Sequence, residues 1–311
     1  MPIKIILPGG AGLIGQNLVA LLIDRGYENI VVIDKHKKNL EILKSVQPGI
    51  TTILADLAIP GSWQKHFEGA DVVVMLQAQI GGLYYQDFVD NNVTSTKNIL
   101  GLIQANKISN LVHISSSVVE SESNDFYTLS KVEQERVVVD SGIPCHILRP
   151  TLMFGWFDRK HLGWLARLMK KSLLFPIPGN GKFIRQPLYA KDFCRIIISC
   201  LENKAPAGIF NISGREKIYY IDMIQIIKRV IHANTIILKI PYRIFYALLW
   251  IWALFDKNPP FTTQQLQALV AKDEFEVIDW PGIFSVPNTS FESAVDETFN
   301  HPVYKKIVLE F

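Results

Sequence analysis

The chain has 311 residues, of which 49% are apolar and 20% charged, a composition typical of a globular protein with one large or two unequal domains. Its net charge of +3 argues against a dedicated nucleic-acid-binding protein. The three cysteines, Cys145, Cys194 and Cys200, fit neither a metal-binding spacing nor a disulfide framework, and the seven histidines form no metal-binding pair. We therefore expect a protein of the reducing cytoplasm without a metal site.

Short apolar, β-branched runs alternate with helical stretches through the first half of the chain. We expect strands at 3–8, 29–34, 50–56, 70–78, 110–116 and 145–150, and clear helices at 13–26, 86–106 and 127–140. Continuous apolar strands separated by helices predict a parallel sheet of the α/β class, doubly wound and covered on both faces. We place the first domain at residues 1–150.

The pattern changes after Pro150, and we expect a smaller, mainly helical substrate domain at residues 151–311, partly interleaved with the first. A helix is predicted from Ala190, a short strand at 208–213, and helices from there to about 270. The most apolar segment, 244–255, would reach roughly 18 Å as a helix, short of the ~30 Å hydrocarbon core, so we expect no transmembrane span. We interpret it as a buried helix. The alternative is a helix resting on a membrane surface, with Arg243 and Lys257 at its ends.

A glycine-rich turn follows the first predicted strand. The stretch "PGGAGLIG" places Gly9, Gly12 and Gly15 between a strand and a helix, where glycine permits a tight turn and a close approach of a pyrophosphate to the helix N-terminus. Asp34 ends the second strand, where a carboxylate can bind ribose hydroxyls and repels a 2′-phosphate. This pattern predicts a Rossmann-type domain that binds NAD. The basic run "KHKK" at 35–38 is the feature that would favour NADP instead.

The chain resembles the short-chain dehydrogenase/reductase superfamily over about residues 3–215. It is most similar to the extended branch, the NAD-dependent epimerase/dehydratase family that contains UDP-galactose 4-epimerase. The resemblance rests on "GGAGLIG", "ADL" (55–57), "MLQAQIGG" (75–82), "DNNVTSTKNIL" (90–100), "HISSSVV" (113–119), "YTLSK" (127–131) and "LRPTLMFG" (148–155). It implies cofactor contacts from Gly9, Gly12, Leu13, Ile14, Gly15, Asp34, Asp56, Leu57, Gln77, Ala78, Lys131 and Pro150. Gln77 stands where the family usually has alanine.

The catalytic residues implied by this resemblance are Ser116, Tyr127, Lys131 and a supporting Asn92. Tyr127 and Lys131 are four residues apart and share a helix face. The resemblance makes Tyr127 the acid/base, with Lys131 lowering the pKa of its phenol and binding the cofactor ribose. Alignment of "NLVHISSSVV" with the family's serine strand favours Ser116 as the catalytic serine, followed by Ser117 and then Ser115. Consecutive strand residues point to opposite faces, so Ser116 does not share a direction with its neighbours.

The substrate is less closely defined. Arg185 lies seven residues before Asp192, a spacing that resembles the diphosphate-binding R-x₆-D stretch of nucleotide-sugar enzymes, so we expect a UDP- or dTDP-sugar bound by Arg185 and Ser117. Tyr127 follows Ser116 by only 11 positions, which shortens the loop that forms the sugar pocket in the family. The alternatives are a ketone reductase or alcohol dehydrogenase with a lipid-like substrate, and a non-catalytic cofactor-binding subunit. The helices at 86–106 and 127–140 resemble those that pair in related dimers, which favours a homodimer.

Overall fold

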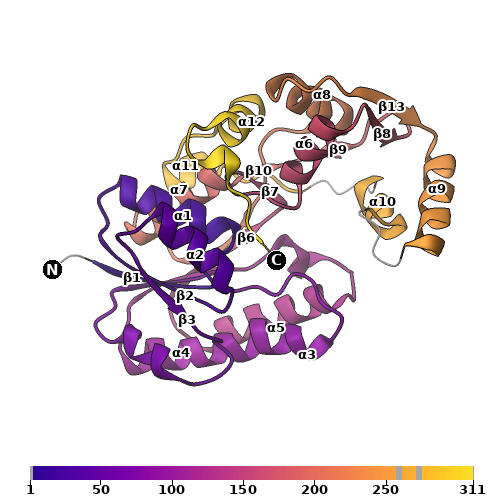
Figure 1. The fold of residues 1–311 in the computed structure, drawn as a ribbon. Helices are drawn as coiled ribbons and strands as arrows, with labels where there is room; N and C mark the ends of the chain where they lie inside the picture. Colours follow the sequence, from indigo (N-terminus) through magenta and orange to yellow (C-terminus); the bar gives the residue numbers. More distant parts are fainter. Residues whose placement is uncertain (1–2, 257–260, 271–274, 311) are drawn as a thin grey trace.

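The computed structural model describes residues 3–256, 261–270 and 275–310, so Lys257 lies outside the described residues. A seven-stranded, all-parallel sheet forms its centre (Figure 1). In spatial order the strands are β11 (Gly208–Ile212), β6 (Cys145–Pro150), β5 (Asn110–Ile114), β4 (Val72–Met75), β1 (Lys4–Pro8), β2 (Asn29–Asp34) and β3 (Thr51–Leu54). The strand order reverses between β1 and β4, which is the doubly wound Rossmann topology. The predicted fold class is confirmed.

Helices cover both faces of this sheet because side chains alternate along each buried strand. Ile5 and Leu7 point into a core shared with α1 and α2, whereas Ile6 points into a second core shared with α4 and α5. Figure 1 shows α1 and α2 on one side of the sheet and α4 and α5 on the other. The helices and turns of this part are α1 (Leu13–Asp24), α2 (Lys37–Val46), a 3₁₀ helix (Ser62–Phe67), α3 (Tyr85–Phe88), a π-helix (Val89–Thr94), α4 (Ser95–Ala105), a 3₁₀ helix (Ser117–Glu120) and α5 (Phe126–Asp140). The predicted helix at 86–106 is thus three consecutive helical segments.

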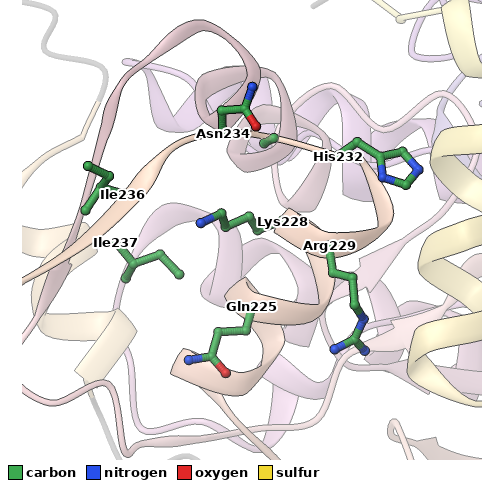
Figure 2. Close-up of a pocket in the computed structure, with 8 residues that line it drawn as sticks. Gln225, Lys228, Arg229, His232, Asn234, Ile236 and Ile237 are labelled. Atoms are coloured by element: carbon green, nitrogen blue, oxygen red, sulfur yellow. The ribbon is translucent and has the colours of Figure 1, made fainter.

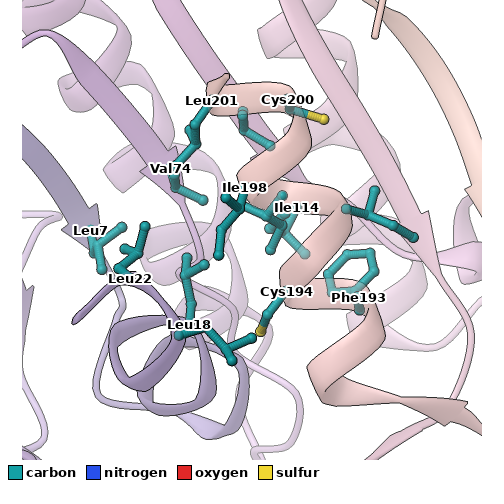
Figure 3. Packing of buried hydrophobic residues seen from close by; sticks show 14 of the residues in the cluster. Leu7, Leu18, Leu22, Val74, Ile114, Phe193, Cys194, Ile198, Cys200 and Leu201 are labelled. Carbon is teal, nitrogen blue, oxygen red and sulfur yellow. The ribbon is translucent and has the colours of Figure 1, made fainter. Parts of the chain in front are cut away.

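The second half of the chain returns to the first sheet. Helix α7 (Ala190–Leu201) packs beside α1, and Figure 3 shows Phe193, Cys194 and Ile198 meeting Leu18 and Leu22 over the sheet. The short α11 (Trp280–Phe284) packs against the same core. Because β11 also joins the sheet, segments from both halves of the chain build the Rossmann core.

A separate apolar core holds most of the remaining elements together, lined by side chains such as Phe175, Ile177, Ile224 and Val295. The elements that contribute to it are β7 (Met153–Phe154), α6 (Leu162–Lys171), β8 (Leu174–Pro178), β10 (Leu188–Tyr189), β12 (Ile218–Tyr219), α8 (Tyr220–Val230), β13 (Ile236–Ile240), α10 (Thr263–Val270) and α12 (Phe291–Asn300). The other elements of this part are β9 (Ile184–Arg185), α9 (Tyr242–Phe255) and a 3₁₀ helix (Tyr304–Lys306). In Figure 1 most of these elements lie beyond the carboxyl ends of the sheet strands.

The expectation of a buried helix at 244–255 is wrong. Helix α9 is present, but only Phe245 and Leu249 are buried, in a small cluster with Leu266 of α10. Most of its other side chains face solvent, including Phe255 at 87% exposure. Hydropathy predicted the helix, but nothing described in the structure packs over most of it. Across the described ranges, no helix is both long and apolar enough to cross a membrane.

Candidate active site

The predicted functional residues gather at the carboxyl edge of the parallel sheet. The glycine turn follows β1, Asp34 ends β2, Asp56 follows β3, Gln77 follows β4, and Ser116 follows β5. Parallel strands place these ends along one edge, where the reversal in strand order opens a crevice for a ligand. Topology therefore brings together residues that are more than 100 positions apart in the chain.

The glycine turn is built for close contacts. Gly9 has a φ of +73°, and a Cβ placed there would lie 2.4 Å from the backbone of Gln77. A Cβ on Gly15 would lie 2.2 Å from the carbonyl oxygen of Gly10, so only glycine lets α1 begin this close to the turn. A Cβ on Gly12 would meet nothing nearer than 3.9 Å. The N-terminus of α1, which has no acidic residue in its first turn, is thus open to an anion beside Gly12.

Asp34 is oriented by the same turn. Its carboxylate accepts hydrogen bonds from the backbone N–H groups of Ala11 at 3.0 Å and His36 at 2.9 Å. Burial raises the pKa of this carboxyl, and the two N–H groups oppose that shift by stabilising the charged form. Two hydrogen bonds leave further lone pairs on a carboxylate, so Asp34 can still accept bonds from ribose hydroxyls.

The neighbouring basic run does not form a free cationic site. Each of its residues has a partner in the chain: Lys35 with Asn91 and Asp56, His36 with the N–H of Asn39, Lys37 with Glu41, and Lys38 with Glu310. These contacts satisfy the charges that could otherwise attract a 2′-phosphate. The arrangement therefore favours the interpretation based on Asp34, in which NAD is preferred over NADP.

The other residues expected to contact the cofactor differ in exposure. Leu13 and Ile14 are half-buried at the start of α1, and Ala78 is exposed after β4. Pro150 is buried at the end of β6. Leu57 is only 6% exposed, and its side chain belongs to the core between the sheet and α4. Any contact from Leu57 to a cofactor would have to come from its backbone.

Ser116 and Tyr127 meet in the structure. Ser116 follows β5 and begins the 3₁₀ helix, and Tyr127 is in the first turn of α5, whose N-terminus is capped by the Asp125 carboxylate. Burial raises the pKa of the Tyr127 phenol, while a hydrogen bond with the Ser116 side chain lowers it. Ser117 lies one step further along, partly exposed in the 3₁₀ helix. The short segment between Ser116 and Tyr127 is therefore long enough to bring the two hydroxyls together.

Lys131 is buried one turn further along α5. Its ammonium donates to the carbonyl oxygen of Ile114 at 3.0 Å and to the side-chain oxygen of Gln134. It has no exposed surface, and burial lowers its pKa from 10.5 to about 7, with the charge of Glu135 opposing the shift.

The expected lowering of the Tyr127 pKa is absent here, since that pKa is raised. The reason is that burial of the phenol raises its pKa most strongly, and the charge of Asp125 raises it further. The Lys131 ammonium is held instead by Ile114 and Gln134.

Asn92 belongs to a buried polar network that the sequence did not reveal. It lies in the π-helix, where its side chain accepts from the backbone N–H of Gln79 at 2.7 Å and donates to the Ser130 hydroxyl at 2.9 Å. Asn92 therefore connects the end of β4 to the helix that carries Tyr127. π-helical segments frequently occur at functional sites, and the expected helical pattern at 86–106 did not distinguish this one.

The hydroxyl of Thr96 is the centre of the second part of this network. It donates to the Asn92 carbonyl at 2.7 Å and accepts from the side-chain amides of both Gln77 and Gln134 at 3.0 Å. Gln134 in turn accepts from Lys131. The glutamine that replaces the usual alanine after β4 is thus coupled through Thr96 to the residue that holds Lys131.

A second group of polar residues surrounds Ser115. The Glu135 carboxylate accepts from the Ser115 hydroxyl and from the guanidinium of Arg149, which also reaches Glu120 at 2.7 Å. These contacts connect β5, α5 and β6 beside the site. Because Ser115 is bonded to Glu135, Ser116 is the serine left to meet Tyr127.

Arg185 lies on the short strand β9, which pairs antiparallel with β12. Its guanidinium donates to the carbonyl oxygen of Ile184 at 2.8 Å and lies 5.2 Å from the ring centre of Phe183. A strand and an aromatic ring thus hold the side chain in the C-terminal part of the chain.

The comparisons with known proteins fit this geometry. A model of the NAD dependent epimerase/dehydratase family matches residues 5–213. The chain belongs to this family. It is 22% identical to the UDP-glucose 4-epimerase of Vibrio cholerae, over 83% of this chain and 82% of the relative. It is 26% identical to a 2-alkyl-3-oxoalkanoate reductase of Stenotrophomonas maltophilia, over 57% of this chain and 59% of the reductase.

Solved structures show the same fold. The UDP-glucuronic acid 4-epimerase of Bacillus cereus, solved with NAD, superposes with a TM-score of 0.74 at 20% identity, covering 98% of this chain and 99% of that one. The UDP-glucose 4-epimerase of Thermotoga maritima, solved with UDP-glucose, gives 0.76 at 16% identity, with coverage of 96% and 98%. The chain is accordingly an NAD-dependent enzyme of the epimerase/dehydratase type.

The residues at the sheet edge fit NAD. The surface beside Gly12 is open at a helix N-terminus, and the Asp34 carboxylate lies at the end of the neighbouring strand. The buried side-chain oxygen of Gln77, adjacent to Gly9, has no hydrogen-bond partner among the described residues. Such an orphaned acceptor costs stability until a donor reaches it, and a bound cofactor can supply one.

Proposed function

We propose that the protein catalyses epimerisation or dehydration of a nucleotide sugar, with Ser116, Tyr127 and Lys131 as the reacting side chains. The observation that carries the proposal is the proximity of the Ser116 side chain to the Tyr127 phenol at the carboxyl end of β5, where Ser116 lowers the pKa of that phenol against the effect of burial. Family membership supports the class of reaction. The UDP-glucose bound in the Thermotoga maritima relative supports the class of substrate.

In this proposal each side chain has one task. NAD supplies a reversible hydride acceptor. Tyr127 removes the proton from the substrate hydroxyl as the ketone forms and returns it later, which is general acid/base catalysis. Ser116 donates a hydrogen bond to the substrate oxygen and holds it beside the phenol. Lys131 can lower the pKa of Tyr127 when charged, so a proton acquired by Lys131 would favour the phenolate.

The proposed substrate contacts extend into the C-terminal part of the chain. The planar guanidinium of Arg185 can donate two parallel hydrogen bonds to a diphosphate, and its position over Phe183 limits its freedom before binding. We assign Ser117 to the sugar because its partly exposed side chain follows Ser116 directly. Asn92 acts as a positioning residue, since its contacts with Gln79 and Ser130 connect β4 to α5.

A ligand panel tests this proposal. Thermal unfolding is measured with saturating NAD and each of several UDP- and dTDP-sugars, for the wild type, Arg185→Ala, and Arg136→Ala as an exposed arginine on α5 far along the helix. We expect at least one nucleotide sugar to raise the midpoint for the wild type and Arg136→Ala but not for Arg185→Ala. If none stabilises the NAD-bound wild type, the nucleotide-sugar assignment is wrong.

The second candidate is reduction of a non-sugar ketone. Two observations favour it: the segment between Ser116 and Tyr127 is short, and one relative is a 2-alkyl-3-oxoalkanoate reductase. The same Ser116 and Tyr127 would serve a one-way hydride transfer. Oxidation of NADH by medium-chain 3-ketoacids, with no turnover of nucleotide sugars, would establish this candidate in place of the first.

We further propose a cytoplasmic homodimer. On α5, Phe126, Leu129, Val132 and Val139 are each between 42% and 52% exposed and lie on one helix face by their spacing. An apolar stripe of this kind suits a two-fold contact with the same helix of a second copy. Light scattering should give twice the chain mass, and Leu129→Glu with Val132→Glu should give monomers.

A further inference from the structure

Helix α9 carries an apolar stripe that nothing described in the structure covers. Ile244, Leu248, Ile251 and Phe255 follow the spacing of one helix face and expose from 47% to 87% of their surface. The two buried residues of the helix, Phe245 and Leu249, point toward α10 instead. Soluble proteins rarely expose so large a contiguous apolar surface without a binding partner.

The small sheet before α9 extends this apolar surface. Strands β8 and β13 pair in parallel, with Leu174 opposite Ile236. Alternation buries Phe175 and Ile177 on one face and leaves Leu174, Ile236 and Leu238 more than 40% exposed on the other. Only Pro241 separates β13 from α9. In Figure 1 the helix continues directly from the end of this strand pair.

The surroundings of this surface are strongly basic. Stretches 162–182 and 217–243, which include α6, β8, α8 and β13, contain nine lysines and arginines and one acid, Asp222. The whole chain has a net charge of +3, so the rest of the molecule is net negative. Lys239 and Arg243 are both exposed, immediately before and inside the start of α9. Lys239 and Arg243 therefore place positive charge at the start of the apolar stripe, while one acid, Asp256, follows its other end.

A surface hollow of about 520 Å³ is lined by the end of α8 and the start of β13. It contains Lys228 and Arg229, and Arg229 is paired with Glu292 at 2.7 Å. Figure 2 shows Lys228 extending across it toward the strand, with Arg229 on the same helix and His232 in the turn that follows. Ile236 belongs both to the wall of this hollow and to the exposed face of the strand pair. Cationic and apolar groups thus adjoin in the same part of the surface.

We propose that α9 and the exposed face of β8 and β13 dock onto the surface of an anionic lipid bilayer. Large apolar and aromatic side chains such as Ile251, Trp252 and Phe255 enter the interface, and the flanking Lys239 and Arg243 bind the lipid phosphates. The helix spans roughly 21 Å and lies in the interface instead of crossing it. This inference does not depend on the proposed substrate.

The charge distribution favours a lipid surface over a second copy of the chain. A two-fold contact through this surface would bring the same basic stretches against each other, and like charges oppose such a contact. An anionic bilayer offers opposite charge together with an apolar interior. The stripe on α5 also offers a separate surface to a second copy.

Co-sedimentation of the full chain with vesicles tests the proposal. The vesicles are phosphatidylcholine alone or phosphatidylcholine mixed with phosphatidylglycerol. We expect binding to the mixed vesicles that weakens with added salt. Ile251→Ser with Phe255→Ser should weaken binding roughly 30-fold through lost apolar burial. Lys239→Gln with Arg243→Gln should weaken it roughly 25-fold, at about 5-fold per charge, on the anionic vesicles only.

Matched controls are present in the Rossmann part. Ile59→Ser removes an apolar side chain that is 64% exposed, and Lys97→Gln removes an exposed charge on α4, so both should bind as the wild type does. NAD titration of every variant reports folding independently of lipid. The proposal is overturned if the wild type ignores anionic vesicles, or if both α9 variants bind unchanged. It is also overturned if the apolar variant turns dimers into monomers, because α9 would then be the contact between copies.

Discussion

Replacing Lys131 by methionine should remove a large part of the pH dependence of folding stability. Burial lowers the pKa of this lysine from 10.5 to about 7 in the folded chain. In the unfolded chain the pKa returns to its ordinary value, so between the two values the unfolded state binds more protons. The cost of burying the ammonium is full below about pH 7 and disappears above about pH 10.5. The wild type should therefore become more stable as the pH rises.

The size of the effect follows from the same two values. Each pKa unit corresponds to about 1.4 kcal/mol, and integration of the proton difference from about pH 7 to about pH 9 gives a gain of roughly 2 kcal/mol. Methionine keeps an apolar side chain of similar length and removes the titration. Other groups titrate over this range in both proteins, so the quantity to compare is the difference between the wild type and the variant.

Urea unfolding at several pH values, followed by far-UV circular dichroism, measures this difference. Lys97→Met is the control, because Lys97 is exposed on α4. We expect the gain of Lys131→Met between about pH 7 and about pH 9 to be roughly 2 kcal/mol smaller than that of the wild type and of Lys97→Met. Equal gains in all three proteins would show that Lys131 does not titrate as a buried base.

Two further predictions concern the site itself. Calorimetric titration should show that NAD(H) binds at least several-fold tighter than NADP(H). The reason is that Asp34 repels a 2′-phosphate, while Lys35 and Lys38 are paired with acids. Tighter binding of NADP(H) would contradict this prediction. Tyr127→Phe should lower turnover about 10²–10⁴-fold with nearly unchanged NAD affinity. Lys131→Met should impair both turnover and NAD affinity. Normal turnover by Tyr127→Phe on an identified substrate would mean that another residue acts as the acid/base.

The fold was predictable because the inner strands of its sheet, such as β1, β4 and β5, are buried on both faces. Runs such as 29–34 and 145–150 contain mostly apolar residues, and β2 and β6 occupy the predicted ranges. The strand expected at 50–56 is shorter, Thr51–Leu54, because the chain turns at Asp56, whose carboxylate accepts from the N–H of Ala58. Periodicity also could not predict the π-helix at 89–94, because an added backbone residue changes the hydrogen bonds but not the residue types.

Burial and buried polar contacts were less predictable than the fold. The composition of α9 predicted an apolar helix, but burial depends on what packs against it, and in the described structure only α10 does so closely. The contacts of Thr96 with Gln77 and Gln134 join three separate elements, so no local spacing signals them. The departure from alanine at Gln77 was visible in the sequence. Its consequence became visible only when the fold placed Gln77 beside Thr96.

The buried lysine also predicts how cofactor binding should depend on pH. Ile114 and Gln134 occupy two of the three donors of the Lys131 ammonium, and the third can reach a ribose hydroxyl in the proposed role. An added acceptor favours the charged form, so the pKa of Lys131 should rise when NAD binds. Binding should then take up protons, and affinity should fall as the pH rises above about 7.

Titration calorimetry in buffers of different ionisation enthalpy measures this proton uptake directly. Lys131→Met should bind NAD more weakly and without proton uptake, and uptake unchanged in this variant would place the titrating group elsewhere.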